Sequence, residues 1–199
     1  MGERCGWAVS EQIYLDYHDT EWGMPEYDSR ALWEKLILDG FQAGLSWITI
    51  LKKRDNFREA FQGFYPNIIA EWGEAEVQRL LANPGIIRHR GKIEATINNA
   101  RAASTTVDEH GSLAAFFWSF EPSPAERPEV VDHAALMTMA QTGASKAMSK
   151  ALKKAGWRFV GPTTCYALMQ AAGIVNDHLE GCFRRPEVEE LRSGLTRPG

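Results

Sequence analysis

Residues 83–92 read NPGIIRHRGK, and this stretch decides how the chain folds. It follows an apolar stripe of Val77, Leu80 and Leu81 and precedes a second helical pattern from about residue 90 to residue 103. Proline and glycine end the first helix, and the basic residues begin the second. Backbone N–H groups at such a turn can face a phosphate. The stretch predicts a corner between two helices, either a phosphate-binding hairpin around Gly85 or an ordinary structural turn.

Helical periodicity continues outward from this corner over most of the chain. Asp28 can cap a helix that ends at Gly40, Ser46 can cap a short helix over residues 47–51, and residues 145–154 form another helix, rich in Ala and Lys. No segment alternates as a strand does. The sequence therefore predicts an all-α fold, followed by a loose tail over residues 184–199, which contains few large apolar residues.

Composition sets the broad class of the protein. The 199 residues suit one domain, with or without two lobes, and the balance of 22 basic and 26 acidic residues means that any basic patch must be local. Three cysteines are too few for a disulfide framework. No apolar run approaches the length of a membrane span, and the N-terminus lacks the apolar segment of a signal peptide. We expect a cytoplasmic protein with no membrane partner.

Four potential metal ligands lie near the two ends of the chain. Cys5 and His18 are near one end; His178 and Cys182, near the other, have the i, i+4 spacing that would place them on one helical face. Two cysteines and two histidines are the donors of a tetrahedral zinc site. By spacing alone, unrelated buried cysteines and surface histidines are the favoured interpretation. Cys165 is a rival ligand, although its apolar neighbours indicate a core thiol.

Basic residues gather in three short segments. Lys146, Lys150 and Lys153 or Lys154 repeat on one helical face, and residues 52–58 and 88–92 hold further basic clusters. Any one cluster is typical of a solvated helix face. Three clusters together favour phosphate contacts with a polyanion.

Aromatic residues and one carboxylate form a candidate pocket. Asp39 precedes a polar turn between Gly40 and Gly44, where the backbone can approach a ligand closely. Aromatic faces beside a carboxylate suit a flat, cationic heterocycle. Taken singly, each aromatic is more typical of a core, Tyr14 and Trp22 most of all. The aromatic candidates are Trp7, Tyr14, Tyr17, Trp22 and Trp47.

Six motifs spread over residues 3–183 carry a family resemblance. They are RCGW (4–7), YHDTEWG (17–23), QAGLSW (42–47), GIIRHRGK (85–92), FVGPTTCY (159–166) and VNDH (175–178). In them the chain resembles the 3-methyladenine DNA glycosylase I family of the helix–hairpin–helix superfamily. The resemblance implies an all-α fold with one domain over residues 1–183, built as two helical lobes with a zinc site joining the termini. It also implies a monomeric enzyme that flips N3-methyladenine out of double-stranded DNA and excises it, without lyase activity.

The resemblance also implies roles for particular residues. The zinc ligands would be Cys5, His18, His178 and Cys182. The base would lie among Trp7, Tyr14, Tyr17, Asp39 and Trp47, with Asp39, Tyr17 and Trp47 as the catalytic group. The DNA contacts would come from Gly44, Leu45 and Ser46 in the gap left by the base, and from the hairpin around Gly85 on the backbone. The basic clusters add Arg88, Arg90, Lys92, Lys150 and Lys153 as further candidates for phosphate contacts.

One departure from the family pattern concerns the base contact. Asp39 stands where close members carry a glutamate, and Phe41 is larger and more apolar than the residue of some members. Two alternatives therefore stand beside excision of N3-methyladenine. They are excision of a different alkylated base, and binding of damaged DNA or free methylated purine without cleavage.

Overall fold

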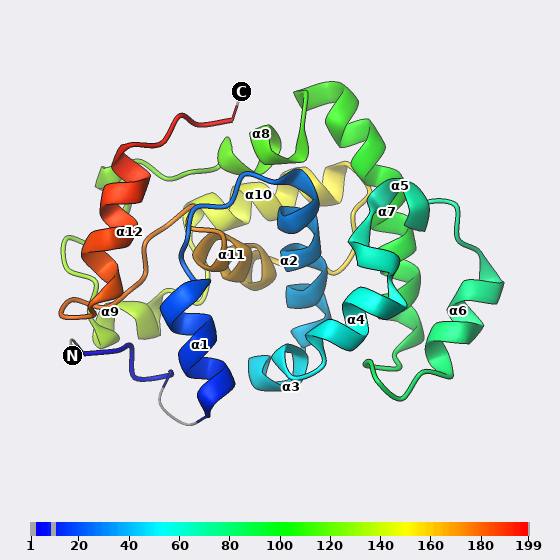
Figure 1. Cartoon of the computed structure of the whole chain (residues 1–199). Helices are drawn as coiled ribbons and strands as arrows, with labels where there is room; N and C mark the ends of the chain where they lie inside the picture. Colours follow the sequence, from blue (N-terminus) through cyan, green and yellow to red (C-terminus); the bar gives the residue numbers. More distant parts are fainter. Residues whose placement is uncertain (1–2, 9–10, 199) are drawn as a thin grey trace.

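The computed structural model describes residues 3–8 and 11–198 (Figure 1). Within these residues the chain is helical, and its one β-type contact is an isolated bridge between Glu3 and Cys182. The all-α prediction is thus confirmed. No helix of the described residues is long and apolar enough to cross a membrane. The helices are α1 (Gln12–Thr20), α2 (Ser29–Gln42), α3 (Trp47–Leu51), α4 (Arg54–Ala60), α5 (Pro66–Ile69), α6 (Glu74–Leu81), α7 (Arg90–His110), α8 (Leu113–Trp118), α9 (His133–Thr138), α10 (Gly143–Lys154), α11 (Pro162–Ala171) and α12 (Arg184–Ser193), with short 3-10 turns at Gln62–Phe64 and Pro124–Glu126.

Helix α2 lies at the centre of the molecule, with α4 to α7 on one side and α1, α11 and α12 on the other (Figure 1). Its N-terminus is capped as predicted, because the Asp28 carboxylate accepts a hydrogen bond from the Ala31 N–H at 2.7 Å. The helix continues to Gln42, two residues beyond its predicted end. Gly40 permits close packing instead of ending the helix, since a Cβ there would lie 3.4 Å from the Phe159 carbonyl.

Phe41 points into the core that α2 shares with its neighbours. It is fully buried, and its ring centroid lies 4.8 Å from that of Phe57 and 5.8 Å from that of Phe61. Burying such a side chain stabilises the fold by about 1.5–3 kcal/mol. Phe41 therefore belongs to the packing of α2 against α4 and does not line the aromatic cavity described below.

The α6–α7 corner is fastened to α3 and α4. The Lys53 ammonium donates to the carbonyls of Pro84 and Gly85 at 3.1 and 3.4 Å. The Gly85 N–H donates to the Asn83 side chain at 2.8 Å, so this N–H group is satisfied within the turn. A side chain at Gly85 would be crowded, since its Cβ would lie 3.2 Å from the Cβ of Asn56.

Residues 184–193 form helix α12 where the sequence predicts a loose tail. Val188 is fully buried, and the Arg192 guanidinium pairs with Glu121 at 2.8 Å. Arg197, beyond the helix, pairs with the same carboxylate at 2.7 Å. One apolar anchor and a shared ion pair thus order a segment that is otherwise polar.

Candidate active site and metal cluster

A cavity of about 310 Å³ opens where α1, α2, α3 and α11 meet. Its volume lies at the lower end of the range for small-molecule sites. Every aromatic candidate from the sequence lines it, which brings together residues from positions 7 to 47. The full lining is Trp7, Tyr14, Tyr17, Trp22, Asp39, Gln42, Trp47, Leu136, Ala167, Gln170 and Ala171.

The aromatic walls pack against one another, Trp7 edge to face with its neighbours and Tyr17 at a tilt to Trp47. The Trp7 ring lies 5.6 Å from Tyr14 and 5.0 Å from Trp22, and Tyr17 lies 5.6 Å from Trp47. The Tyr14 hydroxyl accepts a hydrogen bond from the Ile48 N–H at 3.1 Å, which ties α1 to the start of α3. The sequence alone favours a core position for Trp22. In the structure Trp22 packs in the core and also lines the cavity.

Among the residues that the structure describes, Asp39 supplies the only carboxylate of this cavity. Its side chain is buried, with the residue 6% exposed, and its Oδ2 atom has no hydrogen-bond partner within the described chain. Burial raises the pKa of Asp39 well above its ordinary value, against the opposing influence of Lys35. The Trp47 Nε1–H group is likewise buried and finds no partner in residues 3–8 and 11–198. An acceptor and a donor are therefore both available to a ligand.

Sequence reasoning missed four residues of the lining. Leu136 comes from α9, and Ala167, Gln170 and Ala171 come from α11. No local motif marks them, because their position depends on how distant helices pack. The apolar pattern of α11 does predict a buried helix. This pattern is the one sequence signal for Ala167, Gln170 and Ala171.

The turn between α2 and α3 presents residues 44–46 to solvent. Gly44 has a φ of +81°, which favours glycine, and Leu45 is 41% exposed despite its apolar side chain. Ser46 is the residue before α3, but the cap predicted for its side chain is not formed. Its hydroxyl bonds to the Thr49 hydroxyl at 2.8 Å and makes no side-chain bond to the helix backbone.

Lys92 does not lie on the exposed face where a phosphate contact is predicted. Its side chain is buried, and its ammonium donates to the carbonyls of Phe41 and Ala43 at 2.8 and 2.6 Å. These carbonyls belong to the C-terminal end of α2, where a cation is favourable. Lys92 is therefore a cap for α2, and this corrects the prediction made from its sequence neighbours.

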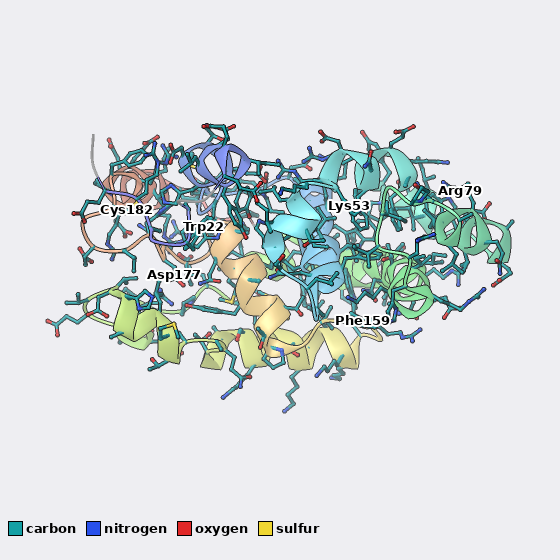
Figure 2. The ribbon with its side chains drawn as sticks, turned by 90° about the horizontal axis from the view of Figure 1, so that it is seen from below. Trp22, Lys53, Arg79, Phe159, Asp177 and Cys182 are labelled. Carbon is teal, nitrogen blue, oxygen red and sulfur yellow. The ribbon has the colours of Figure 1, made fainter. Side chains whose placement is uncertain are left out.

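The other basic candidates are on the surface. Arg88 is exposed, whereas Arg90 pairs with Glu74 at 2.9 Å and with Glu94 at 3.1 Å. Lys150 and Lys153 are exposed on α10, and Figure 2 shows nitrogen-tipped side chains projecting from this helix away from the rest of the molecule. A role for these residues in binding DNA stays a prediction.

The four metal-ligand candidates converge on one buried point. The ligand atoms of Cys5, His18, His178 and Cys182 all lie within 4.8 Å of one another, while Cys165 lies outside this cluster as a buried thiol directed at the Val160 carbonyl. His178 and Cys182 reach the cluster from a turn between α11 and α12, so the predicted shared helical face is wrong. A hydrogen bond from the Cys182 N–H to the Leu179 carbonyl at 2.9 Å closes this turn.

Hydrogen bonds orient both imidazoles of the cluster. His18 Nδ1 lies 2.8 Å from Asp19, which the Arg4 guanidinium holds at 2.7 Å, and His178 Nε2 lies 3.0 Å from the Trp22 carbonyl. The opposite nitrogens, His18 Nε2 and His178 Nδ1, face the cysteines. Burial lowers the pKa of both histidines, that of His178 to about 4, so the rings are neutral and able to bind a metal.

The aromatic cavity and the cluster adjoin through residues 17–23. Tyr17 lines the pocket while His18 points into the cluster, and Trp22 contacts both. Figure 2 shows Trp22 and Cys182 at the same end of the molecule, opposite Arg79. Gly23 has a φ of +82°, and a Cβ there would lie 2.9 Å from His178 Nε2. Gly23 thus permits residues 17–23 to pack closely against His178.

Comparison with known proteins gives consistent matches over this whole region. A model of the family described as methyladenine glycosylase matches residues 7–185. DNA-3-methyladenine glycosylase 1 of Escherichia coli K12 is 50% identical over 185 residues, which cover 92% of this chain and 97% of that protein.

Solved structures agree with the sequence matches. A crystal structure of 3-methyladenine DNA glycosylase I superposes with a TM-score of 0.82 at 52% identity, covering 92% of this chain and 100% of the other. The Staphylococcus aureus enzyme, whose structure describes 3-methyladenine recognition, superposes with a TM-score of 0.85 at 36% identity, covering 92% and 96%. The matches confirm the resemblance predicted from the motifs: the chain belongs to the methyladenine glycosylase family.

Proposed function

We propose that this chain excises N3-methyladenine from alkylated double-stranded DNA by hydrolysing the bond between the base and deoxyribose. The observation that carries the proposal is the buried Asp39 carboxyl, whose Oδ2 has no partner among the described residues, in an aromatic cavity. Adenine methylated at N3 is flat and positively charged, so it matches aromatic faces and a carboxylate. The similar proteins of E. coli and S. aureus are named for this base.

The reaction needs little acid catalysis from the protein. Positive charge on the base weakens its bond to the sugar, so the enzyme must flip the nucleotide, exclude water around the base and hold it while water attacks the sugar. In our proposal Trp7 and Trp47 stack on the base, and Tyr14 completes the wall. Asp39 and Tyr17 bind the edge of the base, and Asp39 also balances its charge.

The DNA duplex would lie across the α2–α3 turn and the α6–α7 corner. Leu45, between Gly44 and Ser46, would enter the space left by the flipped base. The corner around Gly85, with Arg88, would hold the backbone as a helix–hairpin–helix motif does, and Lys150 and Lys153 would add phosphate contacts. Arg90 joins them only by exchanging its ion pairs with Glu74 and Glu94 for a phosphate.

We also propose that the Cys5–His18–His178–Cys182 cluster holds one structural zinc ion. In a tetrahedral zinc site the sulfur–nitrogen edges are about 3.5–3.6 Å, from bond lengths of about 2.3 and 2.0–2.1 Å. The corresponding distances are 3.4 Å from Cys182 to His18, 3.5 Å from Cys182 to His178 and 3.7 Å from Cys5 to His178. Burial raises the pKa of Cys5 to about 12, so a bound cation would supply the charge that stabilises its thiolate.

We further propose a monofunctional, monomeric enzyme with a single domain, which extends beyond the predicted boundary at residue 183 to include α12. Lyase chemistry needs an amine free to attack the sugar, and Lys35, near Asp39, is paired with Glu21. Alkali after the reaction should therefore be required to break the DNA strand. A strand break without alkali would contradict the absence of lyase activity.

The test is the release of free base from DNA methylated to contain N3-methyladenine, detected by chromatography and mass spectrometry. Release of 3-methyladenine supports the proposal. Release of another alkylated base alone would assign a different substrate, and tight binding of the damaged DNA with no release would assign a non-cleaving binder.

A further inference from the structure

A second cavity, of about 220 Å³, lies behind the base pocket and shares with it the wall formed by Tyr17, Asp39, Trp47 and Ala171. The front pocket is aromatic, whereas the rear cavity is lined mostly by charged side chains, among them Glu21, Lys35 and Arg54. Of the carboxyl groups that the structure describes, Asp39 alone borders both spaces. The charged side chains of the rear cavity therefore lie on the side of Asp39 that the proposed base does not occupy.

Three of these charged groups form a connected cluster. Both oxygens of the Glu21 carboxylate are used, one by Lys35 at 2.9 Å and the other by Arg54 at 2.6 Å. Lys35 and Asp39 are four residues apart on α2, so their side chains share one face of this helix. Lys35 nevertheless directs its ammonium at Glu21. Glu21 in turn lies three residues beyond the cluster ligand His18 and just after the last residue of α1.

The other titratable groups around Asp39 come mainly from α1, α2, α4 and α11. Tyr17 on α1 and Cys165 on α11 are both buried, and burial raises the pKa of each, that of Cys165 to about 12, so neither carries charge in the ordinary pH range. Arg54 begins α4 and is balanced by Glu21. Further along the cavity, Arg30 and Arg58 both pair with Glu34, and Glu26 completes the charged lining. Lys35 is the cation whose field opposes the effect of burial on Asp39.

We propose that Lys35, held in place by Glu21, is a positioning residue that acts through Asp39 and decides how readily this carboxyl carries its negative charge. The cluster touches neither the base nor the sugar. Its effect on the reaction rests on the proposed function, in which an ionised Asp39 binds the cationic base. Without the Lys35 charge, nothing opposes the effect of burial on the Asp39 carboxyl, so this carboxyl stays protonated to higher pH. Removing the Glu21 charge leaves two unbalanced cations nearby, so Asp39 loses its proton at lower pH.

The experiment uses Lys35→Met and Glu21→Gln, which retain most of the side-chain volume, and a pH titration of the Asp39 carboxyl carbon by NMR in the free protein. The Asp39 signal is identified as the one absent from Asp39→Asn. We expect the titration to move to higher pH in Lys35→Met and to lower pH in Glu21→Gln. Lys35→Arg should restore the wild-type midpoint. Movement of both variants in the same direction, or no movement, would overturn the proposal.

Single-turnover excision over the same pH range gives the second measurement. The acid limb of the rate profile should follow the NMR midpoint, with Lys35→Met about threefold or more slower than wild type on that limb. Arg58→Gln is the matched control, since its charge lies in the same cavity but is paired with Glu34, and neither measurement should change. If neither the wild type nor any variant excised the base, the proposed function would be wrong. The NMR titration would still decide the role of Lys35.

Discussion

Lys92, the third residue of α7, donates a hydrogen bond of 2.6 Å to the carbonyl of Ala43, the residue that ends α2. The same ammonium donates to the Phe41 carbonyl, and together these bonds join the start of α7 to the turn that carries Leu45. In the sequence the two segments are about fifty residues apart. The position of the turn that would enter the DNA thus depends on a buried cation from the corner that would hold the phosphate.

Lys92→Met should destabilise the protein without changing its phosphate contacts. The methionine fills the apolar path of the lysine stem but leaves two carbonyls without their charged donor, at a cost of about 1.5–3 kcal/mol. We expect a lower melting temperature and slower excision, because the α2–α3 turn loses its anchor. The slope of log affinity against log salt should equal that of wild type. A slope flattened by about 0.9 would mean that Lys92 contacts a phosphate after all.

Cys182→Ser should remove the bound metal and lower the melting temperature. Loss of a structural metal site costs on the order of 4 kcal/mol, which for a chain of this size is about 8–16 °C. Cys165→Ser is the control, because Cys165 is equally buried but lies outside the cluster. Elemental analysis should find one zinc per chain in wild type and in Cys165→Ser. A Cys182→Ser protein that melted like wild type would count against the zinc assignment.

Much of this architecture could be predicted from local patterns. Short segments determine the Asp28 cap, the apolar stripe of α2 and the types of ligand atom in the candidate metal site. The structure contains all three features. The sequence motifs link these segments to one family. The candidate residues for the base converge on one cavity and the four candidate metal ligands on one cluster, whereas the candidate DNA contacts lie elsewhere.

What could not be predicted depends on contacts between distant segments. Lys92 sits in a basic run, so its sequence neighbours indicate a surface residue, and its burial follows from the meeting of α7 with α2. The α12 segment has one fully buried apolar residue, too few for a periodic signal, and Glu121 orders it from far along the chain. The i, i+4 spacing of His178 and Cys182 equally fits a tight turn, which the structure has in place of a helix.

Charge reversal on α10 should weaken DNA binding in a salt-dependent manner. Lys150 and Lys153 are exposed, and removing one interaction with a DNA phosphate should flatten the slope of log affinity against log salt by about 0.9. We therefore expect the double variant Lys150→Glu, Lys153→Glu to bind DNA more weakly at low salt. Arg197→Glu, a reversal near the C-terminus and outside α10, serves as control. Unchanged binding of the double variant would remove α10 from the DNA interface.

Asp39→Asn should make the protein more stable and less active. In the folded protein burial raises the pKa of Asp39 well above its ordinary value of 3.8. The folded state then holds this proton more tightly than the unfolded state, so the stability contribution of Asp39 falls as pH rises through the interval between the two pKa values. Asparagine does not titrate. The variant should therefore melt higher than wild type at neutral pH, and the difference should disappear below about pH 3.8.

Excision should change in the opposite direction. Asp39→Asn removes the charge and one acceptor from the base contact, and losing a charge-assisted hydrogen bond of about 1.5–3 kcal/mol slows excision roughly tenfold to a hundredfold. Asp39→Glu should retain excision, because it restores the residue that the family carries. Melting temperature and single-turnover excision are measured on the same preparations across pH. An Asp39→Asn protein that melts higher yet excises at the wild-type rate would separate the buried carboxyl from the reaction and remove Asp39 from the base site.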